Sequence, residues 1–263
     1  MGVKLTLLGT GTSQGVPVIA CDCPVCTSED VRDRRLRSSV LFEVEGEDAP
    51  EGKRTFVVDT GPDFRQQMLT AQVQSLDAVL FTHEHKDHVA GLDDVRAFNF
   101  RQKRDMDVHA HARVQAALRR EFEYIFADHP YPGVPRIQMH GLDGTPLTIG
   151  GVHVVPLPVT HYKLPVFGFR IGAVSYITDA NAFEPETWER LEGTEVLVLN
   201  ALRKEKHISH FNLDEALEVI AKVKPKVAYL THISHLLGRH ADVEAQLPDG
   251  VFVGEDGLTI SAS

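Results

Sequence analysis

The stretch Thr82-His83-Glu84-His85-Lys86-Asp87-His88 decides how the rest of the chain is interpreted. It follows the apolar run Ala78–Phe81 and precedes Val-Ala-Gly-Leu-Asp-Asp, which predicts a loop that turns into a helix. In the extended part His83 and His85 project to the same side, whereas Asp87 and His88 fan outward where the chain becomes helical. One segment can therefore serve two metal ions.

The residue types of this segment point to hydrolytic chemistry. Imidazole nitrogens and carboxylate oxygens suit Zn, Mn or Fe, and two such ions ~3.5–4 Å apart can hold a bridging hydroxide as nucleophile. With 14 histidines among 263 residues, a chance occurrence of H-x-H-x-D-H has a probability on the order of a few in a thousand. The alternative, a polar loop of solvated histidines, is therefore disfavoured.

Short β-rich runs alternate with segments of helical spacing, which predicts an α/β chain. The predicted strands are Lys4–Leu8, Ser39–Val44, Arg54–Val58, Ala78–Phe81, Val152–Val155, Phe167–Ile171, Val174–Ile177, Val196–Leu199 and Val227–Leu230. The predicted helices are Phe64–Ala71, Val114–Phe126, Pro185–Leu191 and Leu213–Val223. Asn212 can cap the last helix, with Glu215 three residues later. Two predicted strands lead into a Thr-His pair, at His83 and at His232. This repeated pattern predicts that both histidines lie at the carboxyl ends of the strands, on the same side of the fold.

Composition and charge limit the partners and the cellular location that we expect for this protein. The formal net charge of −10 repels polyanions, so it disfavours nucleic acid as a partner. No apolar stretch approaches the ~18 residues of a membrane span, and the N-terminus has no secretory signal pattern. We therefore expect a cytoplasmic protein with one domain over residues 1–263, and homodimer formation stays open.

Cys21, Cys23 and Cys26 lie within six positions. An odd, tightly clustered set without a signal peptide does not suit a disulfide framework, whereas it suits a metal. A closed zinc site would need a fourth ligand from elsewhere in the chain. The alternative is a set of three reduced, buried thiols.

At the segment from His83 to His88 the sequence resembles the metallo-β-lactamase superfamily. Beside the His83–His88 motif, the opening strand and glycine-rich turn match over residues 5–15, and Asp59, His161, Asp179 and His232 fall at matching strand ends. The resemblance implies the four-layer αβ/βα sandwich of the metallo-β-lactamase fold. It also implies two active-site ions (Mn or Zn), one bound by His83, His85 and His161, the other by Asp87, His88 and His232. Asp179 would bridge the ions, and Asp59 would orient a ligand without binding metal.

The early cysteines resemble one branch of this superfamily, the phosphodiesterases of the carbon–phosphorus lyase pathway, which act on phosphoribosyl 1,2-cyclic phosphate. Residues 59–65, Ala201-Leu-Arg and Thr231-His-Ile-Ser-His235 extend the match. By this resemblance Cys21, Cys23, Cys26 and His235 form a structural zinc site. His210 takes the place of the general acid, so His210 and Asp87 are the expected catalytic residues, and His207 and His210 are expected to contact substrate.

We accordingly expect a dinuclear hydrolase, a phosphodiesterase that acts on a small or cyclic phosphate ester without a membrane or nucleic-acid partner. Two alternatives stay open. One is a thioester or other ester hydrolase of the same fold, and the other is a non-catalytic metal or cofactor carrier related to pyrroloquinoline quinone biosynthesis. The tRNA-processing branch is disfavoured because its long Gly/Pro-rich arm is not found here.

Overall fold

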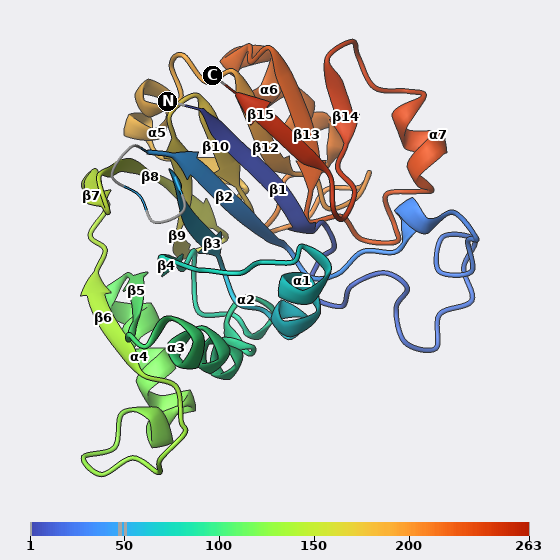
Figure 1. The fold of residues 1–263 in the computed structure, drawn as a ribbon. Coiled ribbons are helices and arrows are strands. Elements are labelled where there is room, and N and C mark those ends of the chain that lie inside the picture. Colours follow the sequence, from blue (N-terminus) through green and yellow to red (C-terminus); the bar gives the residue numbers. More distant parts are fainter. Residues whose placement is uncertain (1, 47–48, 50–51, 263) are drawn as a thin grey trace.

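Two β-sheets form the centre of the computed structural model, which describes residues 2–46, 49 and 52–262 (Figure 1). The first sheet has seven strands in the order β15-β1-β2-β3-β4-β5-β6. In that order their bounds are Thr259–Ala262, Val3–Gly9, Ser39–Glu45, Lys53–Val58, Ala78–Leu80, Met106–Ala110 and Ile137–Gly141. Since β15 pairs with β1, the two ends of the described chain lie side by side in this sheet.

The second sheet has eight strands, seven of them in the order β11-β8-β9-β10-β12-β13-β14, with β7 paired to β8. Their bounds, from β7 to β14 in chain order, are Leu147–Ile149, Val152–His161, Leu164–Ile171, Val174–Ile177, Ala182–Phe183, Val196–Asn200, Val227–Thr231 and Val251–Val253. The neighbours β10, β12, β13 and β14 are parallel, as are β3, β4, β5 and β6 in the first sheet. Each sheet therefore gathers several carboxyl ends along one edge.

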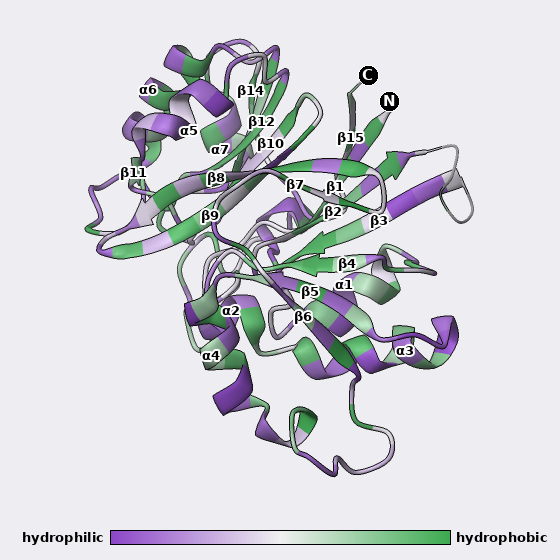
Figure 2. Ribbon diagram, turned by 90° about the vertical axis from the view of Figure 1, so that its left-hand side faces the viewer, coloured by the Kyte–Doolittle hydropathy of each residue, from purple (hydrophilic) through white to green (hydrophobic). Residues whose placement is uncertain are grey.

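Helices cover the outer face of each sheet, which gives four layers (Figure 2). Over the first sheet lie α1 (Phe64–Thr70), α3 (Arg96–Gln102) and α4 (Ala112–Glu121), and over the second lie α5 (Pro185–Arg190), α6 (Leu213–Val223) and α7 (His240–Glu244). Three apolar cores correspond to the three interfaces between layers. The core between the sheets includes Phe42, Phe169 and Tyr176, all fully buried.

Local sequence explains where helix α6 begins. The side chain of Asn212 accepts the N–H of Glu215, and the Glu215 side chain accepts the N–H of Asn212, so α6 begins with the predicted capping box. The expected helix at 114–126 is shorter in the structure, because non-helical backbone at Phe122 separates α4 from a 3-10 turn at Glu123–Ile125.

The α/β class and the predicted four-layer αβ/βα sandwich are confirmed. Among the described residues we find no helix with the length and apolarity needed to cross a bilayer.

Candidate metal centre

The predicted ligands come from strand ends in both sheets. The motif follows β4, and its last part forms the short helix α2 (Lys86–Val89), which carries Asp87 and His88 as expected. His161 ends β8, Asp179 lies two residues after β10, and His232 follows β13. The carboxyl edges of the two sheets thus converge on one point.

Three residues at this point have left-handed backbone. The φ angles are 65° at Asp59, 55° at Asp179 and 53° at His232. Side chains other than glycine adopt this region at a cost, and such residues gather where function requires a particular side-chain direction. Each of the three turns the chain sharply at a strand end and aims its side chain between the sheets.

We call His83, His85, Asp87, His88, His161, Asp179 and His232 the His/Asp cluster. Within it, ligand atoms of His83, His85 and His161 lie within 4.8 Å of one another, and so do those of Asp87, His88 and His232. These are the two sets that the resemblance implied. His85 is the exposed member of the first set, so that side of the cluster opens to solvent.

Asp179 lies between the two sets. Its Oδ2 is 3.2 Å from His88 Nε2 and 3.1 Å from His232 Nδ1. It also groups with His83 and His88, and separately with His161 and His210. This is the position expected of a bridging carboxylate.

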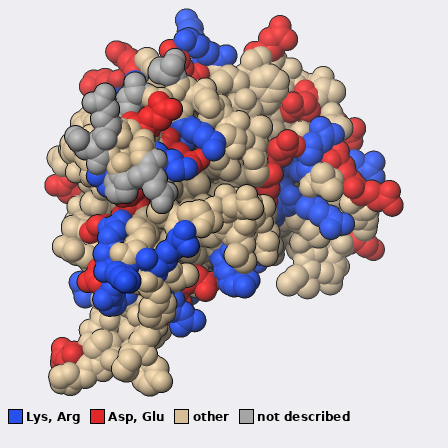
Figure 3. Space-filling model, viewed as in Figure 1, with Lys and Arg blue, Asp and Glu red and all other residues tan. Residues whose placement is uncertain are grey.

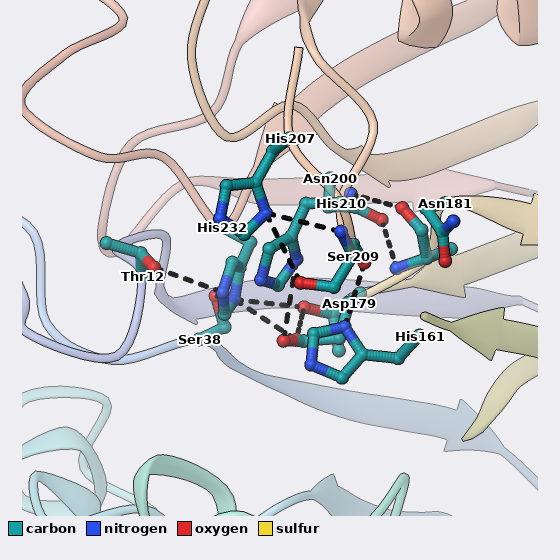
Figure 4. A network of polar contacts seen from close by, with 12 residues as sticks. Thr12, Ser38, His161, Asp179, Asn181, Asn200, His207, Ser209, His210 and His232 are labelled. Carbon is teal, nitrogen blue, oxygen red and sulfur yellow. Dashed lines mark hydrogen bonds and ion pairs between the residues drawn. The ribbon is translucent and has the colours of Figure 1, made fainter. Parts of the chain in front are cut away.

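Hydrogen bonds fix which nitrogen of three imidazoles faces inward. His83 Nδ1–H donates to Thr82 Oγ1 (2.9 Å), and the Thr82 hydroxyl donates to Asp59 (2.8 Å). His88 Nδ1–H donates to Asp59 Oδ2 (2.7 Å). His161 Nδ1–H donates to the Ser209 carbonyl (2.8 Å; Figure 4). In each case Nε2 points into the cluster, where it can bind a cation.

These free nitrogens test whether the residues fit divalent metal ions. His83 Nε2 and His88 Nε2 are buried without a hydrogen-bond partner. His88 Nε2 faces carboxylate oxygens of both Asp87 and Asp179 at 3.2 Å. Burial would lower the pKa of His88, but Asp87 and Asp179 hold it well above the ordinary value, so a cation, either a proton or a metal ion, is favoured between this nitrogen and the carboxylates. Nitrogen with oxygen donors is a set that Zn and Mn accept. The donor set fits.

Electrostatics in the cluster follow from burial and from neighbouring charges. Burial, followed by the charge of His88, holds the pKa of His83 well below its ordinary value, which keeps this imidazole neutral. Burial alone would raise the pKa of Asp179, but His232 and His88 outweigh it, so the net pKa is well below the ordinary value. Burial raises the pKa of Asp59, and the bonds from His88 and Thr82 oppose that rise.

His207 and His210 lie on the loop between β12 and α6, at the edge of the cluster. The His210 ring centroid is 4.5 Å from that of His161 and 4.9 Å from that of His232, and its Nδ1 is 3.8 Å from Asp179 Oδ1. Burial lowers the pKa of His210 to about 3. His207 lies farther out, half-buried, with its ring centroid 5.1 Å from that of His210.

The four residues Cys21, Cys23, Cys26 and His235 also meet, and we call them the Cys/His cluster. Their sulfurs lie 3.3, 3.4 and 3.5 Å from His235 Nδ1. The N–H of Cys26 helps to lower the pKa of Cys23 to about 6, which favours its thiolate. Three sulfurs around one imidazole nitrogen are a Cys₃His donor set, which suits closed tetrahedral zinc.

Sequence reasoning missed the hydroxyl residues around the cluster, Thr12, Ser38, Thr82 and Thr178. Thr12, Ser38 and Thr178 each lie within 3.2 Å of a His232 ring nitrogen. The only signal was the repeated Thr-His pair, which points to Thr82 but not to residues from distant loops.

Comparisons with known proteins place the chain in a family. A model described as the beta-lactamase superfamily domain matches residues 54–233, a span that holds the whole His/Asp cluster. The chain belongs to the beta-lactamase superfamily. Within this superfamily it is similar to a crystal structure described as a new diphosphatase from the PhnP family, with 37% identity and a TM-score of 0.91 over 100% of this chain and 98% of that chain. The chain has the metallo-β-lactamase fold and resembles a member of the PhnP family.

Two curated relatives have other names. An octanoyltransferase of Porphyromonas gingivalis is 38% identical over 258 residues, which cover 97% of this chain and 51% of that protein. Coenzyme PQQ synthesis protein B of Methylobacterium nodulans is 30% identical over 63% of this chain and 54% of that protein. The chain thus spans about half the length of the curated relatives it matches. Zn(2+)-bound PqqB from Methylobacterium extorquens shares the fold, with a TM-score of 0.75 at 21% identity over 98% of this chain and 99% of that chain.

Proposed function

We propose that the chain is a dinuclear phosphodiesterase that cleaves a small or cyclic phosphate ester. The observation that carries the proposal is His88 Nε2 facing Asp87 and Asp179, since this arrangement calls for cations where the two sets of ligands meet. The 37% identity to a diphosphatase over nearly the full length of both chains favours phosphorus–oxygen bond cleavage.

In this proposal His83, His85 and His161 hold one divalent ion, Asp87, His88 and His232 hold the other, and Asp179 lies between them. Bound Zn or Mn would polarise a phosphoryl oxygen and lower the pKa of a water molecule. The chain also orients the metal-binding imidazoles. Asp59 fixes the His88 ring through a 2.7 Å hydrogen bond, and the Ser209 carbonyl fixes His161.

Substrate would enter beside His85 and meet the loop from Leu202 to His210. This loop carries exposed or half-buried basic side chains at Arg203, Lys204 and Lys206. Two backbone hydrogen bonds close the base of this loop. The Leu202 N–H donates to the Phe211 carbonyl, and the Leu213 N–H donates to the Arg203 carbonyl. We assign phosphate contacts to His207 and His210, and proton delivery to the departing oxygen to His210.

A small substrate suits the surface charge. Lys and Arg side chains gather around α3 on the face in Figure 3, but Arg104 lies 3.2 Å from Asp107, and Arg136 lies 3.2 Å from Asp105. Ion pairing leaves fewer free cations for a polyanion, consistent with the net charge of −10.

A second candidate is an acyl ester or thioester hydrolase. It is favoured by the match of 97% of this chain to half of a protein named octanoyltransferase. The test is turnover of bis(p-nitrophenyl) phosphate, an activated thioester and a β-lactam by one sample of known metal content. We expect the phosphodiester to be cleaved with the highest kcat/KM. A thioester cleaved faster than the phosphodiester would replace the first candidate with the second.

Metal analysis of the active protein should give about three ions per chain, two exchangeable and one retained. Mild chelation should remove the two ions of the His/Asp cluster first, because His85 opens that cluster to solvent, while the thiolates hold the third. Elemental analysis before and after chelation, paired with activity, is the measurement. One ion per chain with full activity would contradict the two-metal proposal.

Cys23→Ala should remove the third ion and lower the melting temperature by several degrees, with activity lost only in consequence. The reason is that the cluster ties the early loop to His235, three residues from His232. Zinc content and thermal unfolding are the measurements. Ser28→Ala, on the same loop but outside the cluster, is the control. Unchanged stability and zinc content in Cys23→Ala would rule out a structural zinc site.

A further inference from the structure

The glycine-rich loop after β1 has no role in the function proposed above, yet it lies against the His/Asp cluster. Its backbone is joined to the segment after β13: the Thr12 N–H donates to the Ile233 carbonyl (3.1 Å), and the Ile233 N–H donates to the Thr10 carbonyl (2.8 Å). A Cβ at Gly11 would lie 2.9 Å from the Arg35 carbonyl oxygen, so the loop packs too closely for a side chain there. Thr12 is therefore held in register with His232.

The side chains of these two residues meet in the interior (Figure 4). Thr12 Oγ1 lies 3.2 Å from His232 Nε2, and the residues are 8% and 1% exposed. The other ring nitrogen, Nδ1, faces Asp179 Oδ2 at 3.1 Å. Thus Nε2 points away from the cluster toward a hydroxyl, and Nδ1 points into it.

Two further hydroxyls surround Nδ1, but both direct their hydrogens elsewhere. Ser38 Oγ lies 3.1 Å from Nδ1 and donates to the Gly11 carbonyl (2.9 Å). Thr178 Oγ1 lies 3.2 Å from Nδ1 and donates to Asp179 (2.6 Å). With those hydrogens engaged, Nδ1 is surrounded by oxygen lone pairs, an environment that favours a positive charge at this nitrogen, either a proton or, in the metal-loaded protein, a divalent ion.

We infer that Thr12 is a positioning residue that fixes the tautomer of His232. Its hydroxyl oxygen accepts a hydrogen bond from Nε2–H of His232. The proton then stays on Nε2, and the lone pair of Nδ1 is free to bind a divalent ion. A neutral imidazole carries one proton, so the hydrogen bond at one nitrogen decides which nitrogen can bind metal. This inference rests on the proposed assignment of His232 as a metal ligand.

The test compares zinc affinity in Thr12→Val, which keeps the shape but removes the hydroxyl, with Thr12→Ser, which keeps the hydroxyl. Competition with a chromogenic chelator should show zinc bound about 10–100-fold more weakly by Thr12→Val, and an affinity within about threefold of wild type for Thr12→Ser. Thr6→Val is the matched control, because Thr6 of β1 is also 8% exposed and its hydroxyl bonds that of Thr259 in β15, outside the cluster. It should retain wild-type zinc affinity.

Long-range ¹H–¹⁵N spectra of the zinc-loaded wild type give a second readout, and should show the His232 proton on Nε2. A proton on Nδ1, or equal zinc affinity in Thr12→Val and wild type, would overturn the inference. Phosphodiester turnover is measured separately. If turnover is absent while the Thr12 results are as expected, the proposed function fails and the inference stands. If turnover is present and the zinc affinities are equal, the inference alone fails.

Discussion

Asp179→Ala should lower kcat for an activated phosphodiester by about 1,000-fold or more while the protein remains folded. Asp179 Oδ2 contacts His88 and His232, one from each sheet, so its loss removes the negative charge between the two proposed ions. Two cations that face each other without that charge repel, and at least one should bind more weakly.

The measurements for this variant are kcat, metal content and circular dichroism on the same preparation. Asp107→Ala is a matched control, because Asp107 also accepts a hydrogen bond from a histidine, His140 at 2.6 Å, but outside the cluster. We expect near wild-type kcat in the control. Activity within tenfold of wild type in Asp179→Ala, with two exchangeable ions retained, would exclude the bridging role.

His210→Ala should slow a sugar-type cyclic phosphate by about 10²–10⁴-fold and bis(p-nitrophenyl) phosphate by less than about tenfold. An alkoxide leaving group needs a proton as it departs, whereas nitrophenolate is already stable as an anion. Because burial lowers the pKa of His210 to about 3, its imidazole is neutral near pH 7 before substrate binds. An anionic phosphate beside the ring favours the protonated form, so bound substrate raises the pKa of His210 and promotes its protonation.

The readout is kcat for both substrates in the variant and in wild type. His153→Ala, an exposed histidine of β8, is the control and should change neither rate. Equal losses on the two substrates would leave His210 as a phosphate-binding residue. In that case His207, whose ring centroid is 5.1 Å away, becomes the next candidate for proton delivery.

The strands that sequence predicted are those with strongly apolar runs, and each appears within two residues of its expected start except β9, which begins three residues earlier. Those it missed have mixed polarity or few residues, such as β6 (IQMHG) and β15 (TISA). β15 is stabilised by pairing with β1 at the opposite end of the chain. No local pattern can report such a partner.

For the site, the residue types and spacing around His83 predicted metal chemistry, and the resemblance supplied the ligands from distant strands. The hydroxyls could not be foreseen in the same way. Threonine and serine are common, and the contact of Thr12 with His232 joins residues 220 positions apart through two loops. Only the folded backbone determines that they meet.

The origin of the cluster in both sheets has a mechanical consequence. His83, His85, Asp87 and His88 belong to the first sheet, and the remaining members of the cluster belong to the second. Ions bound as proposed would therefore link the two sheets. They would stabilise the folded state by a free energy that grows with the logarithm of the metal concentration above the dissociation constant. Loss of the metal ions would then lower the stability of the fold as well as the activity, so the same two ions would have a structural and a catalytic role.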